Sequence, residues 1–187
     1  MSGLRSKQLN EITLFIDNAA AKIPFYNGDR TPSGSPVFQG TEANDVIIGS
    51  KSNDLMIGGK GNDKIKAGRG DDRIFGGVGN DSLYGGSGND ALNGGMGNDI
   101  LFGGAGLDKF FINEGYSFIM DFNASEGDFI ALGKHLAGVE WKEKNGSVIV
   151  SSQLGTTTIV NTTIDTICFS AKDVGDSPCT AEQLKLA

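Results

Sequence analysis

Eight aspartates recur every nine residues in the middle of this 187-residue chain. They occupy the sixth position of eight consecutive nonapeptides over residues 40–111 and are Asp45, Asp54, Asp63, Asp72, Asp81, Asp90, Asp99 and Asp108. Carboxylates at regular positions can act as metal ligands, and the block contains no Cys or His that would favour a soft metal. The pattern therefore indicates the binding of a hard divalent cation by oxygen atoms.

A second set of residues with the same period, all apolar, indicates which secondary-structure elements position these aspartates. The eighth position of every repeat is apolar: Ile47, Met56, Ile65, Ile74, Leu83, Leu92, Leu101 and Phe110. One apolar residue between two neighbours fits a very short strand with one buried face, and such strands must stack to be stable. If each repeat makes half a coil, a full coil takes two repeats, and alternate aspartates share an edge. Asp45, Asp63, Asp81 and Asp99 then line one edge, and Asp54, Asp72, Asp90 and Asp108 line the other.

The first six residues of each repeat must turn the chain. We expect the glycines at positions one, two and four to adopt positive φ angles and to leave backbone carbonyls uncovered. Stacked carboxylates repel one another by a few kcal/mol per pair at about 5 Å, so a cation is needed between them. Irregular backbone ligands and a high coordination number favour Ca²⁺ over Mg²⁺. A metal-free solenoid with aspartates capping its turns is disfavoured, because it would not need a glycine triplet in every turn.

With this pattern, GGxGxDxUx with U apolar, the block resembles the RTX calcium-binding nonapeptide proteins. The resemblance implies an all-β fold, a right-handed parallel β-roll with Ca²⁺ between loops on the same edge. It makes the eight aspartates side-chain ligands and implies backbone-carbonyl ligands from Gly59, Gly61, Gly68, Gly70, Gly77, Gly79, Gly86, Gly88, Gly95, Gly97, Gly104 and Gly106. Three intervals on each edge give up to six calcium sites. Thr41, Ala43, Ser50 and Ser52 replace these glycines in the first two repeats, so the 45/63 and 54/72 sites are the least secure.

The sequence divides into three parts. Residues 1–39 are predicted to form an N-terminal helical cap and a loop, because apolar residues recur at helical spacing over 9–23 before Pro24. Residues 40–111 form the β-roll. Residues 112–187 are predicted to form a β-rich C-terminal cap with a hairpin turn at Asn145-Gly146 and a short final helix. The stretch SFIMDFNASEGDFIAL is similar to the segment that closes β-rolls in secreted proteases and alginate epimerases.

Composition excludes several partners. The formal net charge of −7 argues against nucleic acid and anionic membranes, and no apolar run approaches the roughly 18 residues of a transmembrane helix. The N-terminal apolar stretch contains Glu11 and Asp17, unlike a cleaved secretory signal. The family resemblance instead implies secretion by a type I route. Cys168 and Cys179 fit either a disulfide or two thiols.

These observations favour a non-catalytic calcium-binding module that folds on Ca²⁺ binding after secretion and serves as an extracellular structural or adhesive element. No zinc-protease helix motif or nucleophile elbow is present, and the single His135 does not indicate catalysis. Two alternatives stay open: a C-terminal accessory or secretion module of a larger secreted protease, lipase or polysaccharide-modifying enzyme, and a module that binds cell-surface polysaccharide. Asp121 and Asp128 are expected to make turns in the cap, with a further ion there as the alternative.

Overall fold

The computed structural model describes residues 34–112, 114–131, 139–152, 155–163, 166–167 and 169–170. The predicted helices near the two ends lie outside these residues, as do His135, Cys168 and Cys179. In the part of the chain that is described, every regular element of more than one residue is a strand. This part accordingly contains no helix with the length and apolar character needed to cross a membrane.

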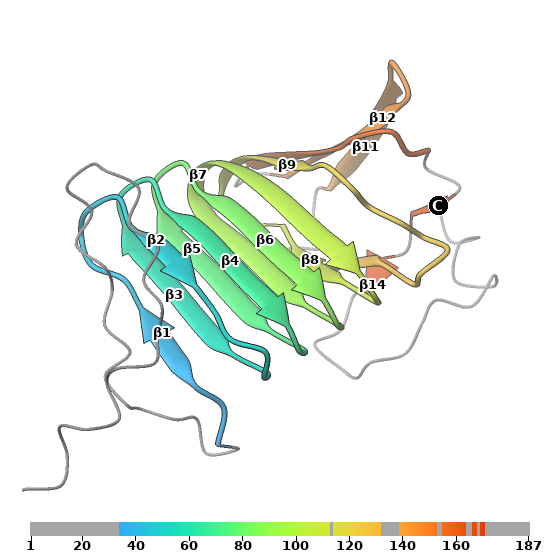
Figure 1. Cartoon of the computed structure of the whole chain (residues 1–187). Helices are drawn as coiled ribbons and strands as arrows, with labels where there is room; N and C mark the ends of the chain where they lie inside the picture. The colour runs from blue at the N-terminus through green and yellow to red at the C-terminus, as the bar shows by residue number, and fades with distance from the viewer. Residues whose placement is uncertain are drawn as a thin grey trace, which may run out of the picture.

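The strands run in a stack from β1 at one end to the cap at the other, as the colours of Figure 1 show. Their bounds are β1 (Val37–Gln39), β2 (Val46–Ile48), β3 (Leu55–Lys60), β4 (Lys64–Arg69), β5 (Arg73–Val78), β6 (Ser82–Ser87), β7 (Ala91–Ala105), β8 (Lys109–Phe111), β9 (Gly115–Ile119), β10 (Phe129–Ala131), β11 (Glu140–Lys144), β12 (Ser147–Ser151), β13 (Gly155–Ile159) and β14 (Phe169–Ser170).

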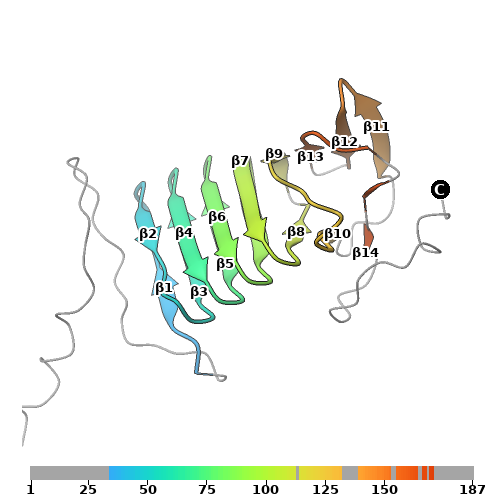
Figure 2. The same cartoon turned by 45° about the vertical axis from the view of Figure 1, so that its right-hand side comes forward.

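Successive strands alternate between two rows, which Figure 2 shows from the side. One row pairs β1, β3, β5, β7, β8 and β10 in order, and the other pairs β2, β4, β6, β7 and β9, all in parallel. Within the repeats, each residue pairs with the equivalent residue two repeats later, as Met56 does with Ile74 and Ile65 with Leu83. The predicted β-solenoid with two nonapeptides per coil is confirmed.

The strands are longer than the three residues expected from the sequence. β3 to β6 each have six residues, because positions one to three of the next repeat also join the ladder. Gly59 pairs with Gly77, and Lys60 pairs with Val78. Gly59 does so at a φ of +118°, which a residue without a side chain can adopt at little cost. The glycines therefore belong to the sheets as well as to the turns.

The core of the coil is a single column of apolar side chains. All eight residues at the eighth position are at most 2 % exposed, as the period predicts. Ile119 and Ile130 continue the column into the cap, where both are fully buried. Each repeat contributes one large inward side chain and cannot bury it alone, so the stack itself makes the core.

The cap extends both rows beyond the repeats. β13 joins β9 in parallel and then continues through the antiparallel strands β12 and β11. Asn145 and Gly146 form the predicted hairpin turn between β11 and β12, with φ angles of 54° and 71°. Positive φ at both turn residues is the geometry that a two-residue hairpin requires. On the other row, β10 follows β8 and pairs with β14.

Candidate metal centre

Seven of the eight repeat aspartates lie immediately before a strand, Asp99 lies within β7, and all eight are buried in the stack. The backbone carbonyl of the aspartate accepts a hydrogen bond from the next coil, as Asp45 O does from Lys64 N at 2.8 Å. The side chains of all eight aspartates are at most 2 % exposed. Eight carboxylates are therefore held out of water, where a charge without a compensating partner is costly.

The aspartates form two hydrogen-bonded columns, one on each edge. In the first six repeats, the backbone N–H of the aspartate donates to Oδ1 of the aspartate two repeats later. These bonds join Asp45 to Asp63 (2.8 Å), Asp63 to Asp81 (2.8 Å), Asp81 to Asp99 (2.9 Å), Asp54 to Asp72 (2.7 Å), Asp72 to Asp90 (2.8 Å) and Asp90 to Asp108 (2.9 Å). The structure thus brings the predicted aspartates together in the expected alternating sets.

In seven of the eight aspartates, the other carboxylate oxygen accepts no hydrogen bond from any residue that the structure describes. Within the described residues, the buried side-chain oxygens without a hydrogen bond are Oδ1 of Asp45 and Oδ2 of Asp63, Asp72, Asp81, Asp90, Asp99 and Asp108. A buried unpaired carboxylate oxygen costs more than a neutral group left unpaired. Oxygens of this kind along both edges fit a hard cation held between the coils.

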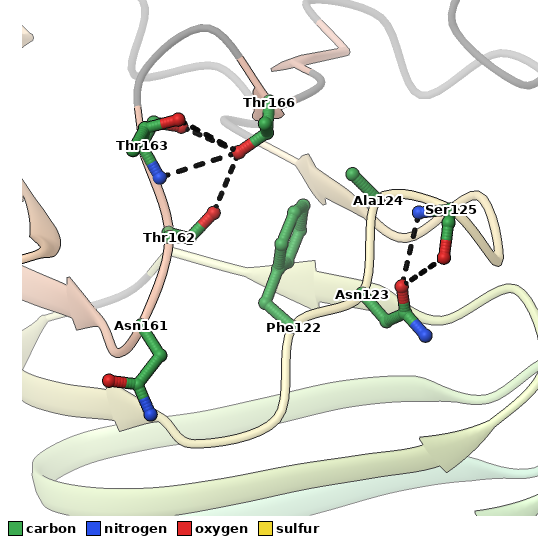
Figure 3. Close-up of a pocket in the computed structure, with 8 residues that line it drawn as sticks. All are labelled: Phe122, Asn123, Ala124, Ser125, Asn161, Thr162, Thr163 and Thr166. Atoms are coloured by element: carbon green, nitrogen blue, oxygen red, sulfur yellow. Dashed lines mark hydrogen bonds between the residues drawn. The ribbon is translucent and has the colours of Figure 1, made fainter.

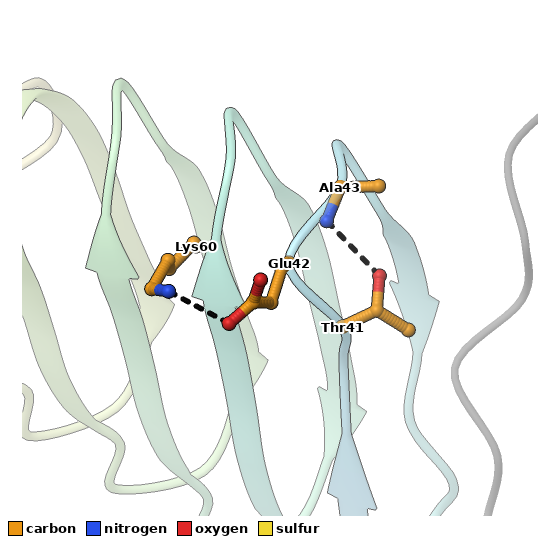
Figure 4. A network of polar contacts seen from close by, with 4 residues as sticks. All are labelled: Thr41, Glu42, Ala43 and Lys60. Carbon is orange, nitrogen blue, oxygen red and sulfur yellow. Dashed lines mark hydrogen bonds and ion pairs between the residues drawn. The ribbon is translucent and has the colours of Figure 1, made fainter.

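No lysine of the repeats supplies the missing positive charge. The one ion pair recorded among the described side chains joins Lys60 Nζ to Glu42 Oε1 at 2.7 Å (Figure 4). Both side chains are largely exposed, at 63 % and 80 %, and lie away from the buried columns. The described residues also contain no cluster of three or more His, Cys, Asp or Glu side chains arranged around one point. A cation between coils would therefore need backbone carbonyls as further ligands.

Burial shifts the titration of these carboxyls. In the metal-free chain, burial raises the pKa of Asp72, Asp90 and Asp108 to about 7 and that of Asp81 to about 6. Hydrogen bonds from backbone N–H groups oppose this rise, and neighbouring carboxylates add to it. A bound cation would reverse the balance by favouring the ionised form.

The glycines at positions two and four have the expected conformation. All twelve of these residues from Gly59 to Gly106 have φ angles between +100° and +140°. A side chain at Gly77 would collide with the carbonyl oxygen of Gly59 one coil earlier. The carbonyls of these glycines therefore stack on one another from coil to coil.

The expectation for the glycines at position one was wrong. None of the seven glycines at this position has a positive φ angle. Glycine is needed there because of close approach: a Cβ atom on Gly58 would meet both Asp63 Oδ2 and the carbonyl oxygen of Gly76. An unpartnered carboxylate oxygen and a backbone carbonyl oxygen therefore converge beside Gly58, and the sequence reasoning missed these position-one carbonyls as candidate ligands.

A second ladder, formed by position five, was also missed. The Oδ1 atom of a position-five residue accepts the backbone N–H of the equivalent residue two repeats later. The pairs are Asn44 with Asn62 (2.7 Å), Asn62 with Asn80 (2.8 Å), Asn80 with Asn98 (2.8 Å), Asn53 with Asp71 (2.9 Å), Asp71 with Asn89 (2.8 Å) and Asn89 with Leu107 (2.9 Å). The signal was present, since six of the eight repeats carry Asn before the aspartate.

Acidic side chains of the cap accept hydrogen bonds from backbone N–H groups of the last coil. Asp121 accepts the N–H groups of Gly103 and Gly104 at 2.9 and 3.0 Å, and Glu126 accepts that of Gly106 at 2.9 Å. Asp128 Oδ1 accepts Asp108 N at 2.9 Å, which extends one aspartate column by a spacing of 20 residues. These bonds of Asp121 and Asp128 reach back to the preceding coil. Asp128 Oδ2 also accepts Asn123 N at 2.7 Å, which is a local contact of the expected turn-making kind.

A hollow of about 340 Å³ lies in the cap beside Phe122 (Figure 3). Its lining also comprises Asn123, Ala124, Ser125, Asn161, Thr162, Thr163 and Thr166. The hydroxyl groups are engaged with one another, as Thr162 Oγ1 and Thr166 Oγ1 are at 2.9 Å. None of the eight lining residues carries an acidic, basic or thiol group.

The repeats match a known family of repeat sequences, and the fold resembles two solved structures. The RTX calcium-binding nonapeptide repeat (4 copies) matches residues 39–74, 57–92 and 75–110. No curated protein matches the chain significantly in sequence. Among solved structures, the extracellular lipase LipA from Serratia marcescens is similar at a TM-score of 0.44 and 16 % identity, over 86 % of this chain and 41 % of the lipase. The AlgE6R3 subunit of the Azotobacter vinelandii mannuronan C5-epimerase is similar at a TM-score of 0.36 and 20 % identity, over 74 % of this chain and 84 % of the subunit.

The chain thus spans about two fifths of the length of the lipase. Its assignment depends on the repeat match and on the geometry of the coil, which agree on the same residues. Eight nonapeptides in phase, two repeats per coil and two columns of buried aspartates all fall within residues 39–110. Residues 39–110 of this chain therefore match the RTX calcium-binding nonapeptide repeat in both sequence and coil geometry.

Proposed function

We propose that this chain is a non-catalytic calcium-binding β-roll that folds when Ca²⁺ binds. The observation that carries the proposal is the set of buried, unpartnered carboxylate oxygens along both edges. The ligands would be the eight repeat aspartates together with backbone carbonyls of the position-two and position-four glycines. Calcium would neutralise the paired carboxylates and allow the coils to close.

Metal binding and folding would then be one equilibrium. The repeat block buries little apolar surface beyond one large inward side chain per repeat, and its glycines lose much conformational entropy on ordering. Without a cation, the folded state would bear the cost of many buried carboxylates. Binding energy that exists only in the folded state stabilises that state directly.

The cellular setting follows from the affinity expected of such sites. Extracellular calcium modules bind at about 10⁻⁴ to 10⁻³ M, so the roll would stay unfolded in a low-calcium cytosol and fold outside the cell. We therefore propose that the chain is secreted by a type I route and acts as an extracellular structural or adhesive module. RTX repeats are typical of secreted proteins, which supports this part of the proposal.

At Tyr84, the outer face of the second row argues against polysaccharide binding. Tyr84 and Phe102 lie on neighbouring strands of that row, with ring centroids 4.9 Å apart and planes within 5°. The Nζ atom of Lys66 lies over the other side of Tyr84, 5.9 Å from its centroid. The faces of the Tyr84 ring are thus engaged within the stack, whereas sugar binding uses an open ring face.

Calcium titration of the full chain followed by far-UV circular dichroism tests the proposal. We expect a β signal that appears with Ca²⁺, reverses with chelator and is not produced by Mg²⁺. Asp72→Asn should raise the calcium concentration at half-folding at least several-fold. Asp71→Asn is the matched control, because Asp71 is exposed and Asn fills the same ladder position in other repeats. A full β signal without metal, or equal effects of the two variants, would refute the proposal.

A further inference from the structure

The aspartates of the first coil accept hydrogen bonds from position-two side-chain hydroxyls, which the later coils do not have. Position two is Thr41 in the first repeat and Ser50 in the second, where every later repeat has glycine. Both residues donate from the side-chain hydroxyl and the backbone N–H to the aspartate of their own repeat. The two hydroxyls are placed differently, and the difference decides which carboxylate oxygens stay free.

Ser50 satisfies both oxygens of Asp54. Its backbone N–H donates to Asp54 Oδ2 at 2.6 Å, and its Oγ donates to Asp54 Oδ1 at 2.9 Å. The Ser50 hydroxyl in turn accepts the N–H of Ser52 at 3.1 Å, so that its own proton points to the carboxylate. Asp54 is accordingly the one repeat aspartate without an unpartnered oxygen among the described residues.

Thr41 leaves one oxygen of Asp45 free. Its backbone N–H and Oγ1 both donate to Asp45 Oδ2, at 2.6 and 2.9 Å, and its hydroxyl accepts the N–H of Ala43 (Figure 4). Asp45 Oδ1 stays buried and has no hydrogen bond within the described part of the chain. The interval between Asp45 and Asp63 therefore resembles the later intervals, although its position-two residue is not glycine.

We take an interval between two coils as open to a cation when both flanking carboxylates have an oxygen without a hydrogen bond. The same criterion applies to the two ends of the columns. Beyond Asp108, the second oxygen of Asp128 accepts the N–H of Asn123 at 2.7 Å. Beyond Asp99, the paired residue is Ser117, which carries no carboxylate. The intervals that meet the criterion are 45/63, 63/81, 81/99, 72/90 and 90/108.

We propose that Ser50 closes the interval between Asp54 and Asp72, so that the block holds five calcium ions, three along one edge and two along the other. The inference rests on the proposed function, which supplies the cation. At the five open intervals a cation meets oxygens that otherwise lack a partner. At the 54/72 interval it would have to displace the hydrogen bonds from Ser50, so the net gain is smaller.

Ion counting on the full chain tests this inference. The bound Ca²⁺ is counted by native mass spectrometry and by elemental analysis after desalting, for the wild type, Ser50→Gly and Ser52→Gly. Both variants restore the glycine of the later repeats, but only Ser50 has a hydrogen bond to Asp54. Ser50→Ala, which removes the hydroxyl and keeps the backbone N–H, is the second variant, and far-UV circular dichroism with Ca²⁺ confirms that each variant is folded.

We expect five ions per chain in the wild type and in Ser52→Gly, and six in Ser50→Gly and Ser50→Ala. A wild-type count of six, or counts that do not differ between the Ser50 variants and the wild type, would overturn the inference and leave the proposed function standing. A wild-type chain that takes up no calcium would refute the proposed function itself.

Discussion

Acidification should stabilise the calcium-free roll. Burial raises the pKa of Asp72, Asp90 and Asp108 to about 7 in the folded, metal-free chain, from an ordinary value of 3.8. A group whose pKa is higher in the folded state stabilises that state fully below its unfolded pKa, and this contribution is lost as the pH rises through the folded pKa. The window of change therefore lies between pH 3.8 and about 7.

The magnitude follows from the distance between the buffer pH and the folded pKa. At about pH 5.5, each carboxyl with a folded pKa of about 7 gains about 2 kcal/mol relative to neutral pH. Three such carboxyls set an upper bound of about 6 kcal/mol, because neighbours in a column share protons and do not titrate independently. Asp90→Asn, which is neutral at both pH values, should remove about 2 kcal/mol of this pH dependence. Asp71→Asn should remove much less, because the Asp71 charge makes only a small contribution to the raised pKa of Asp72 and Asp90.

The assay is osmolyte-induced folding of the calcium-free chain, since trimethylamine N-oxide favours compact states without contributing a metal. Far-UV circular dichroism is followed against osmolyte concentration at about pH 5.5 and about pH 7.5. Less osmolyte should be needed at the lower pH. An equal or higher requirement at about pH 5.5 would show that the buried carboxyls do not limit the calcium-free fold, and the electrostatic reasoning would fail.

Three further predictions concern single residues. Leu83→Ala, at a fully buried site, should lower the free energy of unfolding of the calcium-loaded chain by about 3 to 5 kcal/mol, as measured by urea titration. Gly77→Ala should destabilise far more than Gly146→Ala in the same titration, because both sites have positive φ but only Gly77 faces a backbone carbonyl at contact distance; similar losses would contradict the role given to stacked loops. Asp81→Asn should cost two bound ions and Asp45→Asn only one by native mass spectrometry, because Asp81 flanks two intervals and Asp45 flanks one.

The repeat period made much of the fold predictable. A nine-residue period with one aspartate and one apolar residue specifies which side chains face inward, and the structure buries both sets. The hairpin at Asn145-Gly146 was predictable for a local reason, since few residues adopt positive φ at two successive positions. Such features depend on residue type and spacing alone.

The features that were missed depend on individual atomic contacts within and between coils. The requirement for glycine at position one comes from Asp63 and Gly76 approaching Gly58, and a motif does not distinguish this crowding from a φ requirement. The role of Ser50 depends on which carboxylate oxygen its hydroxyl reaches. Asp128 joins a column at a spacing of 20 residues, so a search at the repeat period passes over it.

The two side-chain ladders run in opposite directions, and this has a consequence for the length of the roll. Each aspartate column uses an acceptor from the following coil, whereas each position-five ladder uses one from the preceding coil. The backbone N–H groups of an interior coil find all their side-chain acceptors only when a coil lies on either side. At the two ends of the block, other residues must supply the missing acceptors. Whole coils could therefore be duplicated or deleted inside the block in steps of two nonapeptides, with neither end redesigned, whereas a cut whose length is not a multiple of nine residues would leave both ladders out of phase.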